Sequence, residues 1–305
     1  MSTQTHNGDS VSMHKRILEK VRRIHIRTSR KVNDVFAGHY RSVFKGQGME
    51  FEEVREYAPG DEIRSIDWNV TARMGYPFIK KFREERELTM MLLVDISASN
   101  QFGSSAQLKQ DLAAELAAVL AFSAVKNNDR VGLILFSDDV ELYVPPEKGV
   151  RHALRVVREV LYFKPRSPKT RVIPAIDYLN RVTRRHTTTF LISDFLFNED
   201  YQRALAITRR RHDLIGIIVG DKREIAWPRA GIVEWVDLES GETMLIDTCN
   251  RATRMMLEAN QRQAKTQVLA NLRRAGIDAI EVYAGEEYEK ELVKFFRIRE
   301  RRQKG

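Results

Sequence analysis

The stretch LLVDISASN, residues 92–100, is an apolar run that ends abruptly in Asp95 and continues with Ser97 and Ser99. Together with the residues before it, the run TMMLLVD predicts a fully buried strand, because it is continuously apolar. The end of the strand has two interpretations. Asp and Ser are preferred helix N-cap residues, and a strand-to-helix turn often carries them for that reason alone. Alternatively, the carboxylate and both hydroxyls face one ion.

Strands and helices alternate on both sides of this stretch from residue 88 onward. A hairpin-like pair, RVGLILFS with VELYVPP, and the buried runs TTFLIS, LIGIIVG and DAIEVYA predict five further strands. Helices are expected at 106–126, 149–163, 173–185, 199–212, 250–275 and 287–299, with a short hairpin at 232–247. The pattern predicts an α/β domain over residues 88–300, with a doubly wound, mostly parallel sheet between helices.

A second aspartate follows another of these strands, since Asp194 comes directly after TFLIS. In an open sheet of this kind, ligands bind outside the carboxyl ends of the strands. If the two strands are neighbours, Asp95 and Asp194 face one crevice. Mg²⁺ and similar ions prefer oxygen ligands in a nearly octahedral arrangement. Two aspartates, two serines and one further hydroxyl would meet that demand.

The segment before the α/β domain has a different texture. In residues 38–87, aromatic and β-branched residues are interrupted by Gly, Pro and charges, which predicts a small β-rich appendage. Trp68 lies among charges there, and the combination of aromatic and Arg is common at interfaces, so Arg64, Trp68 and Arg73 are candidates for contacting a partner. The alternative is that this segment only covers an edge of the main domain. Residues 1–37 are expected to form a tail, disordered up to about residue 12, with an amphipathic helix from Lys15 to Ile24.

The composition narrows the function classes. The 305 residues are 43% hydrophobic and 30% charged, without an apolar run near the roughly 18 residues that cross a bilayer. The lone Cys249 cannot form an internal disulfide, which favours the cytoplasm, and we expect it to be a partly buried, inert thiol. The formal charge of +9 leaves room for an acidic partner, nucleic acid or an anionic membrane.

The motif D-x-S-x-S, here DISAS, resembles the metal-ion-dependent adhesion site of von Willebrand factor A domains. The charged segment RSVFKGQGMEFEEVREYAPGDEIRSIDWNVTARMGYPFIKKFREEREL ahead of it resembles the bacterial family called domain of unknown function 58. The resemblance spans residues 35–245. It implies a von Willebrand A-like fold that binds Mg²⁺ or Mn²⁺ through Asp95, Ser97, Ser99, Asp194 and a middle threonine. In SPKTRVIPAIDYL that threonine is Thr170, with Ser167 as nearest competitor; Asn100 departs from the apolar residue that often follows the motif.

The resemblance also implies a function, a non-enzymatic, metal-dependent protein-binding module that serves a MoxR-type AAA+ ATPase in the assembly or maturation of a client protein. Two other classes stay open. A Mg²⁺-dependent phosphohydrolase would use Asp95 as nucleophile, but it needs a second acid two residues on, where Ser97 stands. A basic nucleic-acid or membrane-surface binder would show a steep salt dependence.

Overall fold

The computed structural model describes Tyr40, Val43 and residues 50–83, 87–101, 103 and 107–304. The expected tail and its helix from Lys15 to Ile24 lie outside the described residues. The chain divides into two compact units, one formed by Phe44–Leu88 and one that contains Thr89–Gly305. The corresponding predicted segments are residues 38–87 and 88–300.

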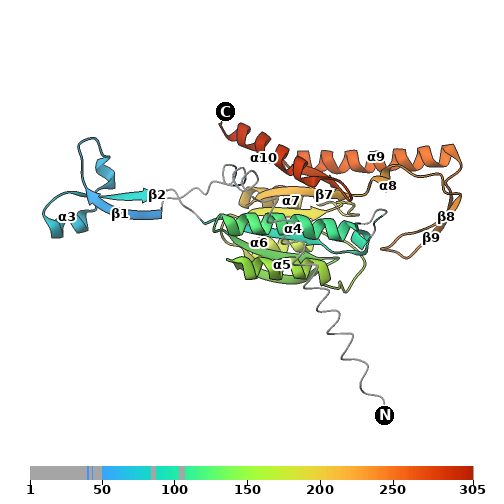
Figure 1. Cartoon of the computed structure of the whole chain (residues 1–305), viewed down its shortest axis with the longest axis horizontal. Helices are drawn as coiled ribbons and strands as arrows, with labels where there is room; N and C mark the ends of the chain where they lie inside the picture. The colour runs from blue at the N-terminus through green and yellow to red at the C-terminus, as the bar shows by residue number, and fades with distance from the viewer. Residues whose placement is uncertain are drawn as a thin grey trace, which may run out of the picture. The chain divides into compact units, whose positions relative to one another are not determined.

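The small unit is built on an antiparallel hairpin with a helix in its connection (Figure 1). Asp67 caps that helix by accepting hydrogen bonds from the backbone N–H groups of Asn69 and Val70, and the helix ends at Gly75, whose φ of 78° suits glycine. Beside the two strands, the predicted β-rich appendage therefore contains a helix, whose ends are set by Asp67 and Gly75. The elements are β1 (Glu50–Glu56), η1 (Ile63–Ser65), α3 (Trp68–Met74) and β2 (Phe78–Arg83).

The large unit has a six-stranded sheet in the order β10-β7-β6-β3-β4-β5. All neighbouring strands are parallel except β4 and β5, which form the expected hairpin. The predicted fold class, a doubly wound and mostly parallel sheet, is confirmed. The elements are β3 (Thr89–Asp95), η2 (Ala98–Gln101), α4 (Lys109–Lys126), β4 (Arg130–Phe136), β5 (Val140–Glu147), α5 (Val150–Tyr162), α6 (Ile173–Val182), β6 (Thr188–Ser193), α7 (Gln202–Arg211), β7 (Asp213–Gly220), α8 (Lys222–Ile225), β8 (Ile232–Val236), β9 (Thr243–Asp247), α9 (Arg251–Arg274), β10 (Asp278–Tyr283) and α10 (Tyr288–Lys304).

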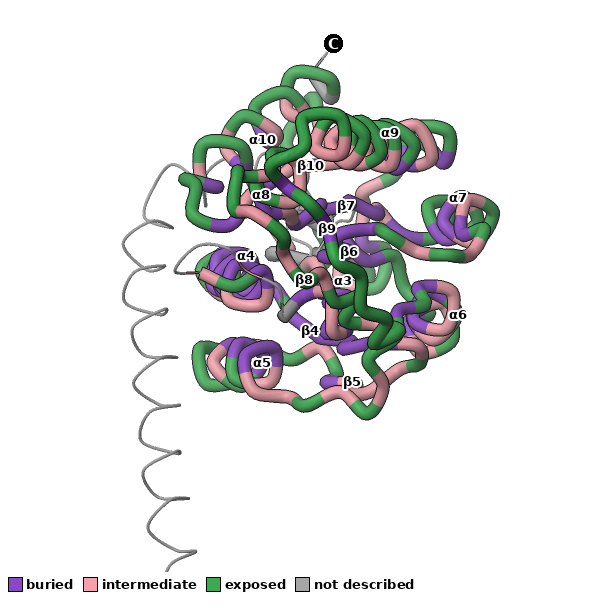
Figure 2. The backbone as a smooth tube through the Cα atoms, turned by 90° about the vertical axis from the view of Figure 1, so that its right-hand side faces the viewer, coloured by how far each residue is buried: buried purple, intermediate pink, exposed green. Residues whose placement is uncertain are grey.

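Helices cover both faces of this sheet, with α4 and α5 on one side and α6 and α7 on the other (Figure 2). The central strand β3 is buried from Met90 to Asp95. Met91 and Leu93 pack into the cluster formed with α6, α7 and α9. Because neighbouring residues of a strand point to opposite faces, a strand covered on both sides must be apolar at every position. This explains the unbroken run that ends at Asp95.

The strands β8 and β9 form a separate two-stranded antiparallel hairpin between α8 and α9. Its bounds agree with the hairpin predicted at residues 232–247. Cys249, just after it, is exposed, so the expectation of a partly buried thiol was wrong. Within the described ranges, no helix is both long enough and apolar enough to cross a membrane.

Candidate functional site

Asp95 and Asp194 meet at the carboxyl edge of the sheet, between β3 and β6. The two strands are hydrogen-bonded neighbours, as the site hypothesis required. The chain leaves β3 through α4 and leaves β6 through α7, which cover opposite faces, so this is the switch point at which open sheets bind ligands (Figure 2). Ser193 links the two strands here, because its hydroxyl donates a 2.7 Å hydrogen bond to Oδ2 of Asp95.

The loop after β3 folds its serines back on the aspartate. The backbone N–H of Ser97 donates to Oδ1 of Asp95 at 2.9 Å, and the hydroxyl oxygens of Ser97 and Ser99 lie 3.0 Å apart. Asn100 is buried, and its amide donates to the carbonyl of Asp95 at 3.1 Å, which tightens the turn. The helix-cap interpretation does not apply to α4, whose N-cap is Leu108. The turn thus gathers the oxygens of the motif without capping the long helix.

A second loop, between α5 and α6, brings Thr170 to the same edge. The carbonyl of Pro168 accepts a 3.0 Å hydrogen bond from the backbone N–H of Ala98, which ties this loop to the serine turn. Thr170 is buried, and its hydroxyl donates to Oε1 of Glu239 at 2.6 Å. The competitor Ser167 is less buried, and its hydroxyl accepts from the backbone N–H of Lys169 at 3.3 Å. Thr170 is the more buried of the two, and its hydroxyl is directed away from its own loop, toward Glu239, whereas that of Ser167 faces its own loop. Both observations favour Thr170 over Ser167.

Three charged residues at this edge were not predicted from the sequence. Lys109, the first residue of α4, is only 1% exposed. Its ammonium lies 3.2 Å from Oδ2 of Asp194 and 2.7 Å from Oε1 of Glu224 in α8. Glu224 is therefore the second of the three, and the third is Glu239, from the turn of the β8–β9 hairpin. No motif marks these residues; only their packing against the strand ends reveals them.

The electrostatics of the edge follow from buried carboxylates held close together. Burial, with the nearby charge of Asp194, raises the pKa of Asp95 to about 7, although hydrogen bonds from Ser193 and Ser97 oppose the shift. Burial also raises the pKa of Glu239, with a smaller contribution from Asp194. For Lys109, burial alone would lower the pKa, but Asp194 and Glu224 outweigh it and hold the ammonium charged.

The donor set can be compared with what a hard cation needs. In the described part of the chain, no three His, Cys, Asp or Glu side chains converge as in an all-acid or histidine metal centre. A cation here would depend on the carboxylate of Asp95 and on hydroxyls, the oxygen donors that Mg²⁺ accepts. Asp194 is less free, because Oδ2 faces Lys109 and Oδ1 accepts from the backbone N–H of Leu196 at 3.2 Å. The residues fit an ion near the serine turn, with Asp194 beside it.

In the small unit, the three predicted partner contacts are exposed. Trp68 opens α3 with 67% of its side chain exposed, and Arg73 lies in the last turn of the same helix. Arg64 lies in η1. Further exposed apolar side chains of this unit are those of Ile63, Met74 and Tyr76. The prediction that these residues are available for contact is consistent with their exposure.

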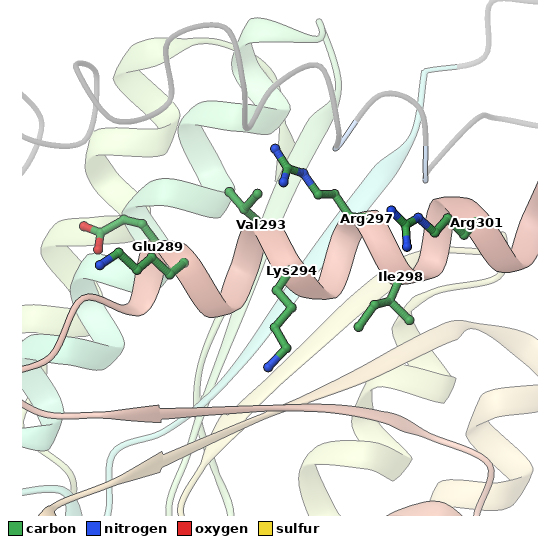
Figure 3. Close-up of a pocket in the computed structure, with 7 residues that line it drawn as sticks. Glu289, Val293, Lys294, Arg297, Ile298 and Arg301 are labelled. Atoms are coloured by element: carbon green, nitrogen blue, oxygen red, sulfur yellow. The ribbon is translucent and has the colours of Figure 1, made fainter.

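One hollow lies away from the candidate site, along α10 (Figure 3). Its volume is about 520 Å³, and none of the predicted site residues lines it. The lining is mostly basic and includes Arg297 and Arg301, from the basic stretch near the end of the chain. Elsewhere on this helix, Arg299 pairs with Asp213 and Arg302 pairs with Asp278. The two aspartates are the first residues of β7 and β10, at the amino ends of the strands and so on the side of the sheet opposite to the candidate site. Part of the basic stretch therefore has a structural role.

Known proteins resemble this chain in sequence and fold. The uncharacterized protein Rv1480 of Mycobacterium tuberculosis is 34% identical over 224 residues, covering 72% of this chain and 70% of that protein. The uncharacterized protein YeaD of Bacillus subtilis is 27% identical over 107 residues, 35% of this chain and 25% of YeaD. Among solved structures, the conserved hypothetical protein BatB from Bacteroides thetaiotaomicron gives a TM-score of 0.46 at 14% identity, covering 70% of this chain and 99% of BatB.

The SpRpn10 VWA domain gives a TM-score of 0.39 at 11% identity, covering 68% of this chain and 94% of that domain. The family described as "Protein of unknown function DUF58" matches residues 53–267, most of both units. The resemblance of the charged segment to this family is thereby confirmed: this chain belongs to the DUF58 family.

Proposed function

We propose that this protein is a non-enzymatic, metal-dependent protein-binding module. Asp95, Ser97, Ser99 and Thr170 would hold Mg²⁺ or Mn²⁺ with Asp194 beside them, and a carboxylate of a partner protein would complete the coordination. The observation that carries the proposal is the pair of serine hydroxyls 3.0 Å apart next to Asp95, at the switch point of the sheet. When bound, the ion would supply positive charge and an open position for an acidic ligand.

The surroundings of Asp95 support binding rather than hydrolysis. Its side chain is 1% exposed, and both carboxylate oxygens already accept hydrogen bonds, from Ser97 and Ser193. A nucleophile needs a free oxygen in line with its substrate, and a phosphohydrolase needs a general acid. Residue 97 offers only a hydroxyl, which lies 3.0 Å from the hydroxyl of Ser99. This arrangement favours a residue that organises a loop over one that attacks a phosphate.

The partner we propose is a MoxR-type AAA+ ATPase, acting with a client protein in assembly or maturation. The support is the family to which the chain belongs, together with a site that lacks its own catalytic acid. A cation completed by a partner's carboxylate gives specificity, because a partner without the acid would leave buried charge uncompensated.

The test is capture of the ATPase by the full chain in Mg²⁺, in EDTA and with Asp95→Ala. Capture should require Mg²⁺ and be lost with Asp95→Ala, because that change removes the carboxylate around which the serine turn is built. The milder Ser99→Ala guards against misfolding, and Asp177→Ala, at an exposed position of α6, is the matched control. Equal recovery under all conditions would contradict the proposal.

We further propose that the small unit provides a second contact with the partner, through Arg64, Trp68 and Arg73. The support is the 67% exposure of Trp68, since large exposed aromatic side chains with neighbouring arginines are typical of interface hot spots. Trp68→Ala should reduce capture at least tenfold while leaving the Mn²⁺ affinity of the large unit unchanged. Unchanged capture would remove this contact, and loss of thermal stability would favour a purely structural role.

A further inference from the structure

The turn of the β8–β9 hairpin points one side chain inward. Of residues 237–242, only Glu239 is half-buried, and the others are exposed. Asp237 shapes the turn: its Oδ1 accepts from the backbone N–H of Glu239 at 2.9 Å, and its Oδ2 accepts from the hydroxyl of Ser240 at 2.7 Å. Gly241, with a φ of 76°, closes the turn through a 2.8 Å bond from its N–H to the carbonyl of Asp237. The direction of Glu239 is therefore built into the turn.

That side chain reaches a member of the candidate donor set. The hydroxyl of Thr170 donates to Oε1 of Glu239 at 2.6 Å, across 69 positions of sequence. The carboxylate thus lies within hydrogen-bond distance of one of the groups that the proposed cation would use. A partner's carboxylate would have to approach the same place.

The charge at this edge shows why the position of Glu239 needs an explanation. Four described carboxylates, those of Asp95, Asp194, Glu224 and Glu239, share the edge with the buried ammonium of Lys109, which already faces Asp194 and Glu224. Adding a carboxylate to such a cluster costs free energy unless positive charge compensates it. Glu239 could have pointed to solvent like its neighbours in the turn, but it points to Thr170.

We infer that Glu239 is an acidic ligand that the chain supplies to its own candidate cation site, and that a partner's carboxylate must displace it. The inference rests on the proposed function and adds a regulatory step to it. The β8–β9 hairpin competes with acidic segments of partner proteins, so only a partner that also detaches the hairpin turn gains the open coordination position.

The hairpin is built in a way that allows this displacement. In the described structure β8 and β9 pair with each other and not with the six-stranded sheet. Several of its large apolar side chains are solvent-exposed, with Ile232 at 72% and Leu245 at 74%. Ile246 is buried in the hairpin, but the turn itself, residues 237–242, buries no apolar side chain, so moving the turn away from Thr170 costs little buried apolar surface. Buried Thr248 holds the base closed through hydrogen bonds with Ala230 and Gly231, so the turn can move while the base stays in place.

The test measures Mn²⁺ alone on the full chain, by titration and by the relaxation of water protons around the bound ion. Glu239→Ala should weaken Mn²⁺ binding at least tenfold, by analogy with the loss of groups that support a metal site. It should also raise the relaxation enhancement, because water takes the position that the carboxylate leaves. Glu242→Ala, an exposed acid in the same turn, is the matched control and should change neither quantity.

The outcomes separate this inference from the proposed function. If Glu239→Ala binds Mn²⁺ like the wild type and the control, with the same relaxation, Glu239 is not a ligand and the inference is overturned while the cation site stands. If the wild type binds no Mn²⁺, or binds it equally after Asp95→Ala, the proposed site fails and the inference falls with it. Weaker binding with higher relaxation, confined to Glu239→Ala, supports both.

Discussion

The six-stranded sheet buries polar groups in different ways at its amino edge, where the parallel strands begin, and at its carboxyl edge, where they end. At the amino edge, the hydroxyl of Thr187 lies 2.9 Å from the hydroxyl of Thr189 and 2.9 Å from Nδ1 of His212, and all three side chains are buried. The carboxylates there are paired, since Asp213 contacts Arg299 and Asp278 contacts Arg302.

At the carboxyl edge, by contrast, Asp194 and Glu224 pair with Lys109, while Asp95 and Glu239 each lie close enough to Asp194 for its charge to raise their pKa. A buried polar group is therefore not by itself the sign of a site, because the amino edge has several, and Nε2 of His212 is buried there without a hydrogen-bond partner in the described structure. What distinguishes the carboxyl edge is that its four described carboxyl groups outnumber its one buried ammonium, and that the pKa values of Asp95 and Glu239 are raised. Burying such charge is costly, so a structure that keeps it gains from a cation or a cationic partner.

The largest expected effect comes from removing the one buried ammonium of the described carboxyl edge. Lys109→Met should lower the free energy of unfolding by about 3–5 kcal/mol, because it leaves buried Asp194 and half-buried Glu224 without their ammonium partner. Lys222→Met, which breaks the exposed pair with Glu286, should cost less than about 1 kcal/mol. Urea unfolding measures both, and equal losses would mean that burying Lys109 with its two carboxylates matters no more for stability than an exposed ion pair at the same edge.

The next largest effect should appear at the amino edge, as a dependence on pH. Burial, with Arg211 and His186 nearby, lowers the pKa of His212 to about 4 from its ordinary 6.5. His212 of the unfolded chain therefore becomes protonated below about pH 6.5, whereas in the folded protein it stays neutral down to about pH 4. The stability that neutral His212 contributes is complete above pH 6.5 and is lost as the pH falls through this window, by about 2 kcal/mol at pH 4.5.

Urea unfolding at pH 7.5 and 4.5 checks this expectation. His212→Gln should flatten the difference between the two pH values, since glutamine does not titrate. His186→Gln, at an exposed position nearby, should leave most of it. An unchanged pH dependence in His212→Gln would show that the neutral network of the amino edge is not what the protein loses in acid.

The difference between the edges also explains what the sequence could and could not predict. Asp95 and Asp194 were predictable because an apolar run that stops at an acid marks a strand end, and parallel strands end at the same edge. Lys109 and Glu239 were not, because a lysine in the first turn of a helix and an acid in a hairpin turn usually face solvent. Their burial is decided by how α4 and the β8–β9 hairpin pack against the strand ends.

The small unit shows the same limit on a local scale. Residues 38–87 predict a β-rich appendage, because aromatic and β-branched residues recur there between Gly, Pro and charged residues. The helix α3 is just seven residues long, too short for a periodic pattern to show, and Asp67 and Gly75 define its ends. Those two cap residues were the available signal, and they are weaker than the β-like composition around them.

The smallest expected effect distinguishes Thr170 from Ser167 as the middle ligand of the candidate site. Thr170→Val keeps the shape of the side chain but removes the donor to Glu239, and should cost about 1 kcal/mol of stability and weaken Mn²⁺ binding severalfold. Ser167→Ala should change neither, because Ser167 contacts its own loop. If Ser167→Ala weakens Mn²⁺ binding and Thr170→Val does not, then Ser167 is the middle ligand. The hydrogen bond between Thr170 and Glu239 would in that case hold the hairpin without reporting on the ion, and the charge at the carboxyl edge would need another explanation.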